Sequence, residues 1–214
     1  MGAMPPRLAG LTGATLPDAP EVCHHCVWWQ SRGARGASKE RWVREAEDAW
    51  GAWGTVYYDD DGRVLGTMQS GPAALFPRGA ELPAGPPSDD AVLVTCAIIL
   101  DRTSPWVLQS LFLAAIGDAK ERGARALEAF GYHYDEGETM LTRFHAHRTI
   151  FPVDFLADFG FHPVRIEGRV ELARLELGGI IESPEEAPAA ARVLRELKGM
   201  LLPQPVPAPG RPRA

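Results

Sequence analysis

Residues 91–131 read AVLVTCAIILDRTSPWVLQSLFLAAIGDAKERGARALEAFG, and this stretch predicts a strand, a helix and a second strand. Val92 to Leu100 is an unbroken apolar run rich in β-branched residues, which is typical of a strand buried on both faces. Ser104 and Pro105 follow as the predicted N-cap and first helical residue, because proline at that position loses no hydrogen bond. Apolar side chains then recur every three or four residues, and the run Ala124 to Phe130 predicts the second strand.

The start of this predicted helix is the first place to expect a ligand. A helix that begins just beyond a strand presents unpaired N–H groups and the positive end of its dipole, and both favour a bound anion.

The composition limits the classes of function. With 214 residues, 45% of them hydrophobic, the chain is long enough to bury a core. A net charge of -6 argues against a general binder of nucleic acid or of anionic membranes, since both need a basic surface. We find no apolar run of membrane-spanning length and no signal-like N-terminus, so we expect a cytoplasmic protein.

Before residue 91 the pattern predicts an N-terminal arm, one amphipathic helix and one β-hairpin. The arm carries EVCHHCVWW at Glu21 to Trp29, a segment too apolar to stay solvated. The hairpin is indicated by two alternating runs around an Asp-Asp-Asp-Gly turn, where glycine tolerates a positive φ. The predicted bounds are 1–38 for the arm, Lys39 to Gly51 for the helix, Thr55 to Tyr58 and Arg63 to Gln69 for the hairpin, and 70–87 for a long proline-rich loop.

After residue 131 we expect a polar and aromatic loop, a short helix over Pro152 to Phe159 and a half-exposed strand over Arg169 to Leu177. The main domain is predicted to span 39–180. A capping box at Ser183 starts a C-terminal amphipathic helix within 181–202, which either folds back on the domain or pairs with a second copy of the chain to form a homodimer. Residues 203–214 are proline-rich and are expected to be disordered.

This order of elements resembles the GNAT acyltransferase superfamily over about residues 39–177. Two local signatures carry the resemblance: the strand, helix and strand at 91–131, and FLADFGF at Phe155 to Phe161. The resemblance implies an α+β fold with a mixed, mostly antiparallel twisted sheet that is flanked by helices and splayed between the strands at 92–100 and 124–130. It also implies an N-acyltransferase that moves an acyl group, with acetyl the first expectation, from acetyl-CoA or another acyl-CoA to a small-molecule amine or a protein amino group.

In the family, pantetheine pairs its amides with the first of these strands, and the pyrophosphate lies on an R/Q-x-x-G-x-G/A turn. Here the turn reads SPWVLQ from Ser104, and framing it on Arg102 also finds no glycine. Pro105 removes one backbone donor as well. A second hypothesis is therefore a protein of the same fold that has lost CoA binding and acts as a binding or regulatory module. The resemblance assigns cofactor binding to Ile98, Ile99, Thr103, Ser104, Trp106, Val107 and Leu108.

Acyl transfer to an amine needs a base for the ammonium and an acid for the leaving thiolate. Glu128, in an otherwise apolar strand, is the candidate base; the alternative is a salt bridge to Arg125 or another arginine. Tyr132 and Tyr134, at the end of that strand, are the candidate acids, and aromatic packing is the alternative for at least one of them.

The motif Cys23-His24-His25-Cys26 suggests a metal, but zinc takes four ligands and one CxxC supplies two. Zinc bound by Cys23 and Cys26 is therefore the less favoured hypothesis, and a reduced, partly buried pair packed beside tryptophans is the favoured one. Cys96, in the middle of the predicted buried strand, is expected to be a core residue.

Overall fold

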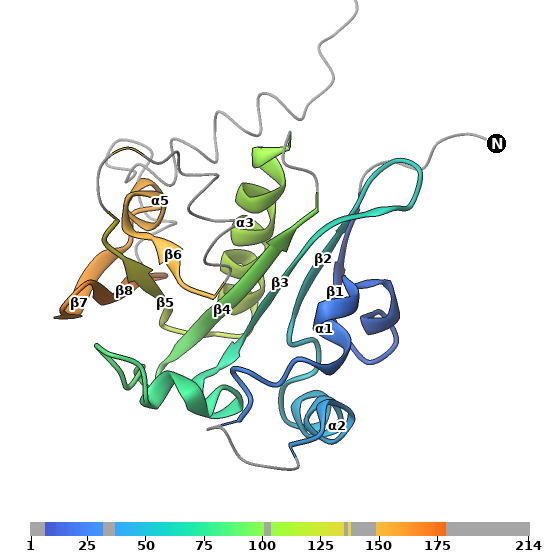
Figure 1. Ribbon diagram of the computed structural model, residues 1–214, viewed down its shortest axis with the longest axis horizontal. Helices are drawn as coiled ribbons and strands as arrows, with labels where there is room; N and C mark the ends of the chain where they lie inside the picture. The colour runs from blue at the N-terminus through green and yellow to red at the C-terminus, as the bar shows by residue number, and fades with distance from the viewer. Residues whose placement is uncertain (1–6, 32–36, 101–103, 135–136, 138–148, 179–214) are drawn as a thin grey trace, which may run out of the picture.

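The computed structural model describes residues 7–31, 37–100, 104–134, 137 and 149–178. In this part of the chain one sheet of eight strands has the order β1-β2-β3-β4-β5-β8-β7, with β6 paired to β5 (Figure 1). The strands are β1 (Arg7–Gly10), β2 (Gly54–Tyr58), β3 (Val64–Pro72), β4 (Ala91–Ile99), β5 (Ala126–Tyr132), β6 (Phe151–Pro152), β7 (His162–Glu167) and β8 (Val170–Glu176). The helices are α1 (Glu21–His25), α2 (Lys39–Trp50), α3 (Pro105–Glu121) and α5 (Val153–Asp158), with short 3-10 turns at Leu16–Asp18, Ala73–Leu75 and Pro77–Ala80.

The sheet is mixed. β4 and β6 each run parallel to β5, and the other neighbouring strands are antiparallel. The predicted α+β class with a mostly antiparallel sheet is therefore confirmed. β5 can run parallel to β4 because the connection between them passes through α3. This long connection returns the chain to the end of the sheet at which β4 begins.

Each face of the sheet carries its own core. α3 and α5 cover one face, where Phe112 is fully buried among a group of aromatic rings. α1, α2 and residues 26–31 cover the other, as Figure 1 shows. The rings around Phe112 are Phe151, Phe155, Phe159 and Phe161; the largest side chains of the second core are Trp29, Trp42, Trp53, Phe76 and Phe130.

Residues 7–31, from the segment predicted as an N-terminal arm, pack on the main domain, and Trp29 is buried there. β1 pairs along β2 as an edge strand, and Leu11 is buried. Gly10 permits this close packing, because a Cβ there would lie 2.8 Å from the Cβ of Ala52. The sequence RLAG has no alternating pattern or β-branched residue, so only the pairing partner defines the strand.

Other predicted elements are confirmed with bounds shifted by a few residues: α2, the β2–β3 hairpin, β4, α3, β5, α5 and β8. β7 was not predicted. All six of its residues are exposed, and apolar and polar side chains alternate over only its last four residues, Val164 to Glu167. Two of the predictions, the C-terminal helix and the tail, concern residues outside the described part of the chain. None of the described helices is both long and apolar enough to cross a membrane.

Candidate functional site

β4 and β5 lie side by side for only four residue pairs and then part. Their parallel pairing runs from Ala91 with Ala126 to Val94 with Ala129. Beyond that point the same edge of β5 is occupied by β6, which pairs at Gly131 and Tyr132. We call the opening between β4 and β5 beyond Val94 the fork. It is the splay that the resemblance implied.

A β-bulge on β4 lies at the point where the strands part. Met68 pairs with Ala97 and Ser70 with Val94, so Thr95 and Cys96 together face the single residue Gln69 on β3. The Thr95 hydroxyl donates to the Gln69 carbonyl at 3.5 Å. A bulge bends its strand and increases the local twist, which turns β4 away from β5.

The backbone of β4 beyond the bulge is directed partly into the fork. The Leu100 N–H donates to the Leu65 carbonyl at 2.8 Å, which makes these two residues a hydrogen-bonded pair of the antiparallel ladder. Because such pairs alternate, the N–H and C=O of Ile98 point toward β3, and those of Ala97 and Ile99 point toward the fork. Among the described residues, no strand pairs with β4 from 95 to 99 on this side.

The register therefore distinguishes the two residues of this strand, Ile98 and Ile99, to which the resemblance assigned cofactor binding. Ile99 directs its amide into the fork, and Ile98 does not. Ala97 does so too but was not predicted, because only the pairing register reveals it. The side chains of all three are buried, so a ligand in the fork would meet backbone here.

At the start of α3 the predicted binding residues mostly belong to the core. Ser104 is the N-cap as predicted, but its side chain makes no capping hydrogen bond, and its carbonyl accepts from the Val107 N–H at 3.0 Å. Val107 and Leu108 are buried in the α3-side core. Thr103 lies outside the described residues.

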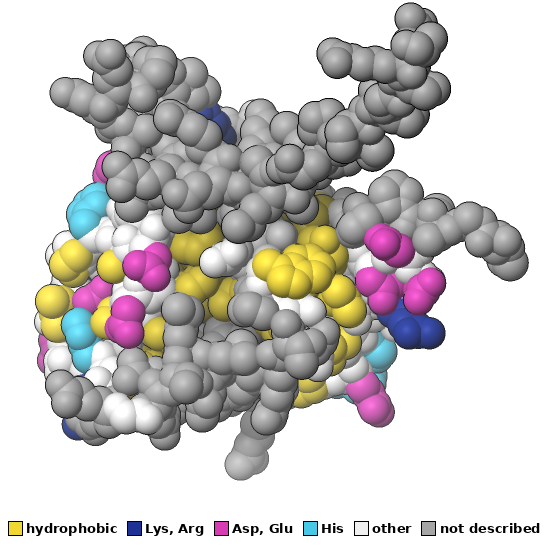
Figure 2. Space-filling model, turned by 90° about the horizontal axis from the view of Figure 1, so that it is seen from above, with side chains coloured by type: hydrophobic (Ala, Val, Ile, Leu, Met, Phe, Trp, Pro, Cys, Tyr) yellow, Lys and Arg dark blue, Asp and Glu magenta, His cyan; other side chains and the backbone are white. Residues whose placement is uncertain are grey.

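Trp106 lies away from the fork. Its indole is 39% exposed and packs edge-on against the Tyr57 ring of β2, with 5.2 Å between ring centroids. β3 and β4 separate β2 from β5, so this contact places the indole outside the fork rather than in it. Trp106 instead borders an open pocket of about 430 Å³, which Leu65 and the acidic hairpin turn also line. Figure 2 looks onto this end of the molecule, where acidic and apolar side chains lie next to each other. The turn contributes Asp59, Asp60 and Asp61.

Glu128 is completely buried and held in an ion pair. Its carboxylate accepts from the Ser88 N–H at 2.7 Å, from the Ser88 hydroxyl at 2.6 Å and from Arg174 Nη1 at 3.1 Å. Glu128 also pairs with Leu93, which lies before the fork. This arrangement corresponds to the salt bridge considered as the alternative role, with Arg174 as partner instead of Arg125.

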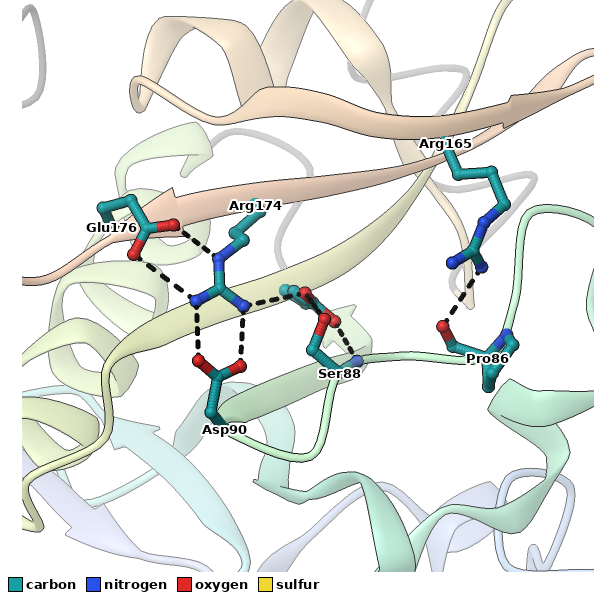
Figure 3. A network of polar contacts seen from close by, with 7 residues as sticks. Pro86, Ser88, Asp90, Arg165, Arg174 and Glu176 are labelled. Atoms are coloured by element: carbon teal, nitrogen blue, oxygen red, sulfur yellow. Dashed lines mark hydrogen bonds and ion pairs between the residues drawn. The ribbon is translucent and has the colours of Figure 1, made fainter.

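Arg174 links three carboxylates at once, as Figure 3 shows. Besides Glu128 it donates to both oxygens of Asp90, at 2.9 and 3.1 Å, and from Nε to Glu176 at 2.6 Å. These hydrogen bonds hold the pKa of Asp90 below its usual value. The network joins the loop before β4 to β5 and β8, so it fixes the closed end of the fork.

Tyr132 and Tyr134 lie at the open end of β5. Their rings are in contact, tilted to each other with 4.8 Å between centroids, and both side chains are partly exposed. Tyr132 is the last residue of β5 and pairs with β6 and β8. The two predicted acids are therefore brought together, next to the fork.

His133, which lies between the two tyrosines in the sequence, contacts Glu171 of β8, and the sequence analysis did not predict this contact. His133 Nε2 is 2.9 Å from Glu171 Oε2, and the Glu171 side chain is only 8% exposed against 44% for His133. Gly131 makes room for Glu171, since a Cβ there would lie 3.0 Å from Glu171 Cγ. No local pattern indicates this pair, because it depends on the register between β5 and β8.

The CxxC motif lies on the face of the sheet that α1 and α2 cover. Cys23 is in α1 and Cys26 is its C-cap. In the described part of the chain no group of three or more His, Cys, Asp or Glu side chains could hold a metal ion. A zinc site at Cys23 and Cys26 is therefore not supported.

Comparisons with known proteins find similarity in structure only. No protein-family model matches the sequence, and no curated protein matches it. An N-acetyltransferase from Staphylococcus aureus Mu50 is similar with a TM-score of 0.48 and 13% identity, over 80% of this chain and 98% of that one. PaiA N-acetyltransferase from Thermoplasma acidophilum, in complex with coenzyme A, has a TM-score of 0.45 and 13% identity over 81% and 99%. The ribosomal-protein-S18-alanine N-acetyltransferase from Escherichia coli has a TM-score of 0.45 and 10% identity over 85% and 98%. Similarity at this level leaves the function to be inferred from the fork itself.

Proposed function

We propose that the protein is an N-acyltransferase that binds an acyl-CoA thioester in the fork and transfers its acyl group to an amine. The observation that carries the proposal is the edge of β4 at 95–99, whose backbone is directed into an opening of the sheet and pairs there with no described strand. An exposed strand edge binds extended ligands through main-chain hydrogen bonds. Pantetheine is such a ligand, because it carries two secondary amides.

The residues of the fork fit the acyl end of this cofactor. Ala97 and Ile99 would bind the pantetheine amides through their backbone N–H and C=O groups. When bound, a CoA thioester supplies an acyl group activated for attack by an amine. Tyr132 or Tyr134 would return a proton to the leaving sulfur, since both hydroxyls lie on side chains at the open end of β5.

The proton of the substrate ammonium needs an acceptor near the fork. Glu128 is one proposal, although three hydrogen bonds already occupy its carboxylate. His133, held by the buried carboxylate of Glu171, is the other, and its exposed ring can exchange protons with solvent. Substituting each in turn, Glu128→Gln and His133→Gln, separates them: the base is the residue whose loss lowers turnover while acyl-CoA binding is retained.

The protein offers a less favourable binding site to the nucleotide end of the cofactor than to its acyl end. The start of α3 has no glycine, and three aspartates line the pocket beside Trp106. Their negative charge opposes a pyrophosphate. We therefore expect S-acetylpantetheine, which lacks the nucleotide, to bind nearly as tightly as acetyl-CoA.

Thermal melting with acetyl-CoA tests the proposal, because a ligand that binds only the folded state must raise the midpoint. At a hundredfold excess over the dissociation constant the gain is about 2.7 kcal/mol. Ala97→Pro is the matched variant: it removes an N–H that points to the fork and spares the ladder to β3. The proposal expects a shift for wild type and a smaller one for a folded Ala97→Pro protein.

The second candidate function is a binding module of the same fold without CoA. The observation that favours it is the glycine-free start of α3, together with the three aspartates of the hairpin turn that line the pocket beside Trp106. It would be supported by an unchanged midpoint with both acetyl-CoA and S-acetylpantetheine.

A further inference from the structure

Glu171 of β8 is a buried carboxyl group on the face of the sheet that α5 covers. It pairs across the strands with Gly131 of β5. A Cβ added to Gly131 would lie 2.8 Å from Val153 Cγ1 and 3.0 Å from Glu171 Cγ, so the Glu171 side chain lies beside the first residue of α5. A carboxylate in such a buried place is stable only where hydrogen-bond donors reach it.

His133 is the described residue that donates to this carboxylate. The residues paired with Glu171 on its two neighbouring strands, Gly131 and Ile166, have no donor in their side chains. The His133 N–H donates to the Arg169 carbonyl at 2.9 Å, so the pairing of β5 with β8 continues to this residue. Two residues after Gly131, His133 is therefore a diagonal neighbour of Glu171 on the same face, and its Nε2 lies 2.9 Å from Glu171 Oε2.

This carboxylate determines which ring nitrogen of His133 carries the proton. An ionised carboxyl group only accepts hydrogen bonds, so Nε2 must be the donor. In the neutral ring Nδ1 is then the unprotonated nitrogen. None of the described residues donates a hydrogen bond to Nδ1, and the His133 side chain is 44% exposed. The ring can therefore take a proton at Nδ1 without breaking its hydrogen bond to Glu171.

Glu128, the other candidate base, has no such freedom. Its two carboxylate oxygens already accept hydrogen bonds from Ser88 and Arg174. It also lies opposite Leu93 at the closed end of the fork, whereas His133 directly follows the last residue of β5 at the open end. The geometry therefore favours His133 over Glu128 as the acceptor of a proton from a substrate.

We propose that Glu171 is a positioning residue that holds His133 in the Nε2–H tautomer, so that His133 Nδ1 takes the proton of the substrate ammonium. The inference rests on the acyl transfer proposed above and supplies its base. Nδ1 accepts one proton from the ammonium and passes it to solvent. The amine nitrogen attacks the thioester carbonyl carbon and the C–S bond breaks. A tyrosine hydroxyl gives its proton to the sulfur, and the second proton that the nitrogen loses restores the tyrosine.

Nitrogen-15 NMR of the imidazole rings tests the tautomer in the full-length protein without any substrate. The chain has six histidines, and the His133 signals are those missing from His133→Gln. In alkaline buffer wild type should show Nε2 protonated and Nδ1 unprotonated. In Glu171→Gln the side-chain amide can donate to Nε2, so a share of the molecules should carry the proton on Nδ1. An Nδ1–H tautomer in wild type, or unchanged His133 signals in folded Glu171→Gln, would overturn the proposal.

Turnover of acetyl-CoA with butylamine as the acceptor tests the role in transfer. A general base usually contributes a hundredfold or more, so Glu171→Gln should lower kcat by at least about tenfold and leave the KM for acetyl-CoA unchanged. Glu167→Gln, an exposed carboxylate on β7, is the matched control and should keep wild-type turnover. In a His133→Gln background Glu171→Gln should have little further effect, because both changes act on the same ring.

The outcomes separate this inference from the proposed function. If acetyl-CoA raises the melting midpoint and turnover is unchanged in both His133→Gln and Glu171→Gln, the acyl transfer stands and the role of Glu171 is wrong. If acetyl-CoA neither binds nor turns over, the acyl transfer fails, and the role of His133 as its base fails with it even where NMR finds the expected tautomer. Should Glu171→Gln not fold, the wild-type tautomer and the turnover of His133→Gln still decide.

Discussion

Replacing Arg174 with methionine should destabilise the protein strongly, because it leaves the carboxylate of Glu128 buried without its cation. Glu128 is 0% exposed, and after the change only the two donors of Ser88 would remain to it. Removing one partner of a buried ion pair costs about 3–5 kcal/mol. For a chain of this length each kcal/mol lowers the melting temperature by about 2–4 °C, so we expect a fall of roughly 6–20 °C.

Urea denaturation and calorimetry at pH 7 measure this effect, and Arg41→Met is the matched control. The ion pair of Arg41 with Glu45 is as short, at 2.8 Å, but both side chains are mostly exposed, so its loss should leave the unfolding midpoint nearly unchanged. The double variant Glu128→Gln with Arg174→Met should be more stable than Arg174→Met alone, because no buried charge is left unpaired. If Arg174→Met were as harmless as Arg41→Met, the structural role given to Glu128 would be refuted.

Further predictions concern single residues. Gly131→Ala would place a Cβ 3.0 Å from Glu171 Cγ and should cost about 1–3 kcal/mol in urea melts, whereas Gly117→Ala, on α3 with open space around it, should stabilise by about 0.5–1 kcal/mol. Burial lowers the pKa of Lys39 in the folded state below its ordinary value of 10.5. Between the lowered folded-state pKa and 10.5 the unfolded state therefore binds more protons than the folded state, and stability rises with pH. Paired melts of wild type and Lys39→Met should show wild type gaining stability relative to the variant as pH rises toward 10.5. Burial raises the pKa of Tyr58 to about 12, so ultraviolet titration should find one late-titrating tyrosine that Tyr58→Phe removes, and its stabilising contribution, complete below pH 10, should be lost as pH rises toward 12.

The sequence predicts the elements that carry a strong local pattern. The apolar run of β4 and the proline-started helix α3 need no information from the rest of the chain, and both were placed within a residue or two. The fork also follows, although only through the resemblance to a family whose sheet is splayed between these strands.

What the sequence does not predict depends on pairing between distant residues. The bulge at Thr95 and Cys96 exists because β3 supplies one residue where β4 supplies two. The contact of His133 with Glu171 depends in the same way on the register of β5 with β8. Glu128 was recognised as a buried carboxyl, but its partner Arg174 lies 46 residues further along the chain.

Residue-resolved hydrogen exchange along β4, with and without acetyl-CoA, tests the central proposal most directly. Exchange at the amides of Ala97 and Ile99 should slow when acetyl-CoA binds in the fork, and exchange at Ile98, already directed toward β3, should not change. Unchanged exchange at Ala97 and Ile99 with saturating acetyl-CoA would contradict the proposal that the fork holds the thioester.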